Sequence, residues 1–98
     1  MIMVTAKMTA KPGERNNIIL KAKDLIESSR SESGCISYNL YTSTEDDDVL
    51  MMLEQWKNQD VLDSHLKTEH FKAFGAAVED ILARELDINV YSVDQIND

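Results

Sequence analysis

The segment from Val49 to Trp56 constrains the fold most, because it has the pattern of a strand with two apolar faces. Its apolar side chains alternate between the faces: Leu50, Met52 and Trp56 on one, and Val49, Met51 and Leu53 on the other. A strand face in contact with water normally carries polar residues, so both faces need a cover. We expect helices to cover one face and the sheet of a second copy of the chain to cover the other. The alternative is a monomer with scattered exposed apolar side chains.

The spacing of the apolar residues changes several times along the chain, between a period of two and helical spacing. Alternation with a period of two predicts strands at 2–10, 35–42, 49–56 and 86–93, and in the second of these Ile36, Tyr38 and Leu40 share a face. Stripes at helical spacing predict helices at 14–30, at 58–66 with Asn58 as N-cap, and after Thr68, which is the N-cap of the last helix. This order is β-α-β-β-α-β with the second helix split in two, an α+β, ferredoxin-like topology in a single domain over residues 1–98.

Composition excludes several classes of protein. The chain has 10 basic and 18 acidic residues among 98, a formal net charge of −8, which disfavours binding to nucleic acid and to anionic membranes. No apolar run approaches the ~18 residues of a membrane span, and the N-terminus has no cationic leader followed by an apolar stretch. A single cysteine, Cys35, fits a reducing compartment. We therefore expect a cytoplasmic protein without membrane insertion.

Several short motifs follow one another along the chain in a specific order. They are Pro12-Gly13 after the first strand, Ser33-Gly34-Cys35-Ile36-Ser37-Tyr38, then Glu54-Gln55-Trp56, and finally the run from His65 to Phe74. Together they resemble the antibiotic biosynthesis monooxygenase family, and within it the quinol monooxygenases, over nearly the whole chain. The resemblance implies a dimeric α+β barrel, in which two sheets pack face to face, and a pocket in each chain between sheet and helices. It also implies oxidation of electron-rich phenols or quinols by O2 without flavin, metal or other cofactor.

The strands supply several candidate pocket residues. Glu54 shares a face with apolar neighbours, where a carboxylate is costly unless it is paired or protonated, so it is a candidate acid or base. The alternative is a structural carboxylate bonded to backbone N–H groups or to a histidine. Trp56 offers a flat wall for an aromatic substrate, and Tyr38 a hydroxyl, although both residue types also serve as core packing. Met52 lies on the same face as Glu54 and is assigned to substrate binding.

The helical region supplies two histidines. His65 is expected to face inward and to take the hydroxyl proton of a quinol, assisted by Glu54, or else to be a core histidine with Glu54 as its partner. His70 and Phe74 are expected to close the pocket, with helix packing as the alternative for His70. On one continuous helix the two histidines would be roughly 140° apart. A paired metal site is therefore not expected.

At two places the chain departs from other branches of this family, and these departures limit the functions that the resemblance implies. The haem-degrading branch typically uses a strand asparagine and a histidine on the long helix, where this chain has Ala6 and the run Phe74-Gly75-Ala76-Ala77. Some polyketide-oxidising members carry an asparagine at the position of Met52. Neither haem degradation nor oxidation of a tricyclic polyketide is therefore expected.

The leading hypothesis is a homodimeric, cofactor-independent monooxygenase that acts on a small aromatic quinol or phenol with O2. A second hypothesis is the isomerisation of a small phosphorylated diketone, as in related signal-degrading proteins, although no basic cluster lies beside the histidines to hold a phosphate. A third is a dimeric binding module without catalysis, in which Trp56 and the histidines line a ligand slot. Substitution of His65 by alanine separates catalysis from binding.

Overall fold

The computed structural model describes residues 1–97 and contains the predicted order of elements. The bounds are β1 Ile2–Thr9, α1 Arg15–Arg30, β2 Cys35–Thr42, β3 Val49–Trp56, α2 Gln59–Leu66, α3 Glu69–Val78, the 3-10 helix η1 Glu79–Ile81, and β4 Asp87–Ser92. The β-α-β-β-α-β topology with a split second helix is therefore confirmed.

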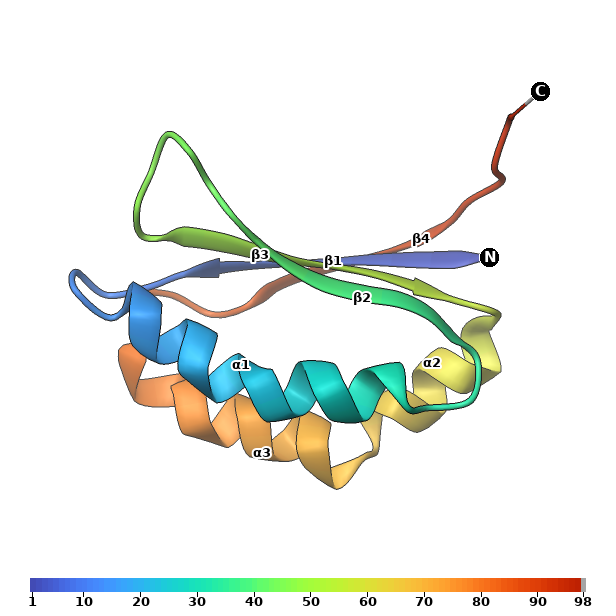
Figure 1. The fold of residues 1–98 in the computed structure, drawn as a ribbon, viewed down its shortest axis with the longest axis horizontal. Coiled ribbons are helices and arrows are strands. Elements are labelled where there is room, and N and C mark those ends of the chain that lie inside the picture. The colour runs from blue at the N-terminus through green and yellow to red at the C-terminus, as the bar shows by residue number, and fades with distance from the viewer. Residues whose placement is uncertain (98) are drawn as a thin grey trace.

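The four strands form one antiparallel sheet in the order β2-β3-β1-β4. All the helices lie on the same side of this sheet, as Figure 1 shows, and leave its other face open. The sheet of the described chain has two free edges, β2 and β4, and does not close on itself. The α+β class is thus confirmed, whereas "barrel" describes a single chain only loosely.

Burial along β3 follows the predicted alternation. Leu50, Met52, Glu54 and Trp56 are buried beneath the helices, and the residues between them are half-buried on the open face. Val4 and Met8 of β1 are buried on the same helix-facing side. The core therefore lies between the sheet and the helices, and the apolar residues of the open face remain outside it.

The start of β2 differs from the prediction. Cys35 pairs with Trp56, but the next pair joins Ser37 to Gln55, so Ile36 is an extra residue in a β-bulge. The bulge reverses the alternation for one residue. Ile36 is therefore exposed rather than on the face of Tyr38 and Leu40, and this part of the prediction is wrong.

Side-chain N-caps mark the starts of α2 and α3. Asn58 Oδ1 accepts a hydrogen bond from the backbone N–H of Val61 at 3.0 Å, which starts α2. Thr68 Oγ1 accepts from the N–H of Phe71 at 3.3 Å and donates to the carbonyl of His65 at 2.7 Å. Both predicted caps are confirmed, and the second redirects the chain between the two histidines.

Within residues 1–97, no helix is both long enough and apolar enough to span a bilayer.

Candidate functional site

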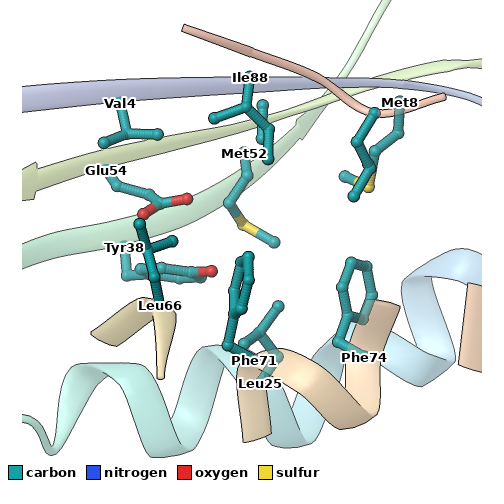
Figure 2. Close-up of a pocket in the computed structure, with 12 residues that line it drawn as sticks. Val4, Met8, Leu25, Tyr38, Met52, Glu54, Leu66, Phe71, Phe74 and Ile88 are labelled. Atoms are coloured by element: carbon teal, nitrogen blue, oxygen red, sulfur yellow. The ribbon is translucent and has the colours of Figure 1, made fainter. Parts of the chain in front are cut away.

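A narrow apolar cavity lies between the sheet and the helices. Its lining comes from the sheet, from α1 and from the α2–α3 region, and consists of Val4, Ala6, Met8, Leu25, Tyr38, Met52, Glu54, Leu66, Phe71, Phe74, Leu86 and Ile88. Figure 2 shows the sheet residues above the cavity and the two phenylalanines below it. About 30 Å³ is available to the centres of water-sized molecules, enough for one or two waters but not for an aromatic ring.

Glu54 is the carboxylate of this cavity. Its side chain is 5 % exposed, and its Oε1 accepts a hydrogen bond from the indole N–H of Trp56 at 3.0 Å. Burial raises the pKa of Glu54 from 4.5 to about 7, and the bond from Trp56 limits that rise. Glu54 is therefore poised to exchange a proton near neutral pH.

Tyr38 adds a phenol to the same cavity. The residue is buried, and its ring lies beside Glu54 and Leu66 in Figure 2. Burial raises the pKa of the Tyr38 hydroxyl above its ordinary value of 10, so the group stays protonated at neutral pH. Tyr38 thus offers a hydrogen-bond donor to a ligand, while Glu54 offers an acceptor.

His65 lies behind this cavity and not on its lining. The residue is 1 % exposed, and its ring centroid is 4.5 Å from Trp56, 5.6 Å from Tyr38 and 5.4 Å from Phe71. Tyr38 and Phe71 line the cavity, so His65 supports its wall from the far side. A direct role for His65 in proton transfer stays a prediction.

The partner of His65 is Glu32 and not Glu54, which corrects the sequence-based expectation. Glu32 Oε2 lies 2.6 Å from His65 Nδ1 and 2.7 Å from His70 Nε2. Burial lowers the pKa of His65, and the hydrogen bond to Glu32 opposes this shift only in part. The ligand atoms of Glu32, His65 and His70 all lie within 4.8 Å of one another; these residues are called the Glu32 cluster below.

The two histidines converge on Glu32, although five residues of one continuous helix would place them about 140° apart. His65 lies on α2 and His70 on α3, and the break at Thr68 turns both rings toward Glu32. Sequence reasoning missed Glu32, because it follows α1 in a segment that was interpreted only as a helix end. The glycine turn at Gly34, which approaches Val61 of α2 closely, is the local signal that this segment contacts the histidine region.

The predicted site residues therefore divide into two groups. Glu54, Tyr38, Met52 and Phe74 line the cavity. Trp56 is buried behind it and reaches it through its hydrogen bond to Glu54, whereas His65 and His70 belong to the Glu32 cluster.

Comparison with known proteins supplies the wider context. Residues 1–77 match the profile of a family described as antibiotic biosynthesis monooxygenase. An uncharacterized protein of Synechocystis sp. is 35 % identical over 92 residues, which are 94 % of this chain but 63 % of that protein, so the chain spans under two thirds of this relative. The probable quinol monooxygenase YgiN of Escherichia coli is 28 % identical, with 92 % of this chain and 95 % of YgiN covered.

A crystal structure shows the same fold. A conserved protein from Methanosarcina mazei Go1 superimposes with a TM-score of 0.88 at 38 % identity, over 92 % of this chain and 89 % of that one. The agreement extends over both the sheet and the helices that enclose the cavity, because nearly the whole chain is matched.

Proposed function

This chain belongs to the antibiotic biosynthesis monooxygenase family, and on that premise we propose that it oxidises a quinol or a related electron-rich phenol with O2, without a cofactor. The observation that carries the proposal is Glu54, a buried carboxylate with a pKa of about 7 in an otherwise apolar cavity. The name of the relative YgiN, probable quinol monooxygenase, also indicates a quinol substrate.

The proposed chemistry begins with a proton transfer to Glu54. Removal of a hydroxyl proton from the bound quinol gives an electron-rich anion, which transfers electrons to O2. One oxygen atom enters the ring and the other leaves as water, so that a quinol and O2 give a hydroxyquinone and water. The quinol itself supplies the four electrons that reduce O2, and the reaction balances without another reductant.

An apolar site favours this sequence of steps. Around the developing anion, the protonated Tyr38 hydroxyl is a candidate donor, and the remaining lining apart from Glu54 is hydrocarbon or thioether. Low polarity also strengthens the hydrogen bonds of an anion to its few partners. Tyr38 therefore orients the substrate oxygen, while Glu54 holds the proton.

The substrate must enlarge the cavity as it enters. Leu66 and Ile88 line the cavity and are also 39 % and 41 % exposed, so they mark its opening to solvent. Figure 2 shows Leu66 on the helical side and Ile88 on the sheet side. Displacement of these two side chains admits an aromatic ring, and their return excludes water during reaction.

We propose further that the open face of the sheet binds a second copy of the chain. Val49, Met51 and Leu53 of β3 are half-buried there, and Tyr41 and Tyr91 on the outer strands are exposed. A second sheet covers such a surface most simply. Leu53→Lys should convert a dimer into a monomer in light scattering, whereas a wild-type monomer at micromolar concentration would refute this assembly.

A further expectation concerns the compartment. The single free cysteine, Cys35, agrees with a reducing cytoplasm.

The experiment that tests the function is oxygen consumption by chelator-treated protein with a panel of reduced naphthoquinols. We expect uptake in proportion to protein concentration, above the rate of autoxidation without protein. Ligand binding without O2 uptake across the panel would contradict the proposal and favour a binding module.

A further inference from the structure

We infer that Glu32, His65 and His70 form a binding site for a divalent transition-metal ion such as Zn²⁺, separate from the cavity in which oxidation is proposed. The inference does not depend on that oxidation.

The three side chains come from three different segments of the chain. Glu32 lies in the turn after α1, His65 in α2 and His70 in α3. Their donor atoms, the Glu32 Oε2, the His65 Nδ1 and the His70 Nε2, lie within 4.8 Å of one another. An ion bound by all three would therefore link three segments of the fold.

The donor set selects the class of ion. Two imidazole nitrogens and one carboxylate oxygen suit Zn²⁺ and its neighbours Co²⁺, Ni²⁺ and Cu²⁺, whereas Mg²⁺ and Ca²⁺ prefer all-oxygen sites. Three protein ligands leave a fourth position for water or a small ligand, as in open zinc sites. The nitrogen donors must be unprotonated to bind an ion.

Small side-chain rotations would bring the three donor atoms from their present hydrogen-bond distances to the distances found between the ligand atoms of a metal ion. The carboxylate oxygen lies 2.6 Å and 2.7 Å from the two nitrogens, which are hydrogen-bond distances with a proton between the atoms. A tetrahedral ion with bonds of about 2.0–2.1 Å holds its ligand atoms roughly 3.3 Å apart. Glu32 and His70 are 16 % and 23 % exposed, so their side chains have room to separate and solvent can deliver the ion.

His65 is the fixed member of the site. Its ring is held by Trp56 and Phe71, with centroids 4.5 Å and 5.4 Å away, so that its Nδ1 faces Glu32 without further ordering. Its Nε2 is buried and has no hydrogen-bond partner within residues 1–97. When Nδ1 binds an ion, the neutral ring carries its hydrogen on Nε2. This N–H group can donate to the face of a neighbouring aromatic ring, which is more favourable than a buried nitrogen lone pair without a donor.

The chain carries its own reporter for this site, because Trp56 is the single tryptophan in the sequence and packs on His65. We would titrate Ni²⁺, a fluorescence quencher, into tag-free, chelator-treated protein and record the emission of Trp56. The inference predicts saturable quenching at one Ni²⁺ per chain, reversal by Zn²⁺, and a higher Tm with Zn²⁺ alone.

Two variants and a control make the test specific. His70→Gln and Glu32→Gln should each weaken Ni²⁺ at least about tenfold, whereas Glu69→Gln, an exposed carboxylate on the same helix as His70, should bind like the wild type. Thermal unfolding of each variant without metal checks that it is folded. Absence of saturable quenching, or equal affinity in the wild type and His70→Gln, would overturn the site. Because the oxidation assay uses metal-free protein, the two proposals fail independently.

Discussion

Two buried or partly buried glutamates lie on opposite sides of one aromatic wall and have different surroundings. Glu54 faces the apolar cavity and accepts a hydrogen bond from the indole N–H of Trp56. Glu32 lies between two imidazoles at a position that solvent reaches. The rings of Tyr38 and Phe71, which line the cavity, contact His65 of the Glu32 cluster.

The difference teaches that environment, and not residue type, assigns a role to a carboxyl group. Isolation in hydrocarbon raises the pKa of Glu54 to about 7, which suits this carboxyl group to the proposed role of proton acceptor. Two nitrogen neighbours make Glu32 one donor of a three-atom set. The predictions below test this division of roles, beginning with the largest expected effect.

The first prediction removes the proton acceptor of the cavity. Glu54→Gln keeps the shape of the side chain but accepts no proton, so kcat/KM for quinol-dependent O2 uptake should fall about 10²- to 10⁴-fold. Glu69→Gln, the exposed control, should retain the wild-type rate. A loss of less than about threefold in Glu54→Gln would show that the cavity carboxylate is not the base.

The second prediction concerns the pH dependence of stability. Because the pKa of Glu54 rises from 4.5 unfolded to about 7 folded, the native state binds this proton more tightly, and its contribution to stability is lost as the pH rises through 7. The free energy of unfolding of the wild type relative to Glu54→Gln should fall by about 3 kcal/mol between pH 4 and pH 8. Urea titrations of both proteins measure this difference, in which the contribution of His65 cancels; parallel pH curves would contradict the burial argument.

The third prediction tests the turn that places Glu32. Gly34 has φ +92°, and a Cβ there would lie 2.7 Å from Val61 Cγ1, so Gly34→Ala combines backbone strain with a clash and should cost about 2–3 kcal/mol. Gly13 has φ +84°, but no described atom lies within 4 Å of its Cβ position. Gly13→Ala should therefore cost only about 1 kcal/mol. Equal losses of stability in denaturant titrations would show that the contact with α2 does not matter.

The last and smallest effect concerns the hydrogen bond from Trp56 to Glu54. Trp56→Phe removes the indole N–H that limits the rise in the pKa of Glu54, so that pKa should move upward by about one unit. The acid limb of the pH–rate profile should shift from about 7 toward 8, while Tyr91→Phe, an exposed control on β4, should leave it in place. A shift toward lower pH would contradict the assigned cause.

Much of the fold could be predicted because its signals are local. The burial of the eight residues of β3 alternates without interruption, as predicted for a strand at 49–56 with two apolar faces. The N-caps Asn58 and Thr68 each act within three residues, and both were identified correctly. The bulge at Ile36 was missed because it depends on pairing with β3, which periodicity does not contain.

The site was only partly predictable for the same reason. Glu54 stood out because a carboxylate interrupted an apolar strand face. Glu32 is 33 and 38 residues away from its two histidine partners, and no spacing rule connects them. The convergence of the two histidines did not follow from the sequence, because the 140° separation applies only to one continuous helix, whereas the break at Thr68 sets their real directions.

The most direct test of the central claim is oxidation of a naphthoquinol under ¹⁸O2 by chelator-treated protein, in which the Glu32 cluster holds no ion. Mass spectrometry of the quinone product follows the isotope, and the amount of O2 consumed is measured in the same reaction. The account predicts one O2 consumed per product, with one ¹⁸O atom in the hydroxyquinone. A product without ¹⁸O, or a product formed equally well under anaerobic conditions, would contradict it.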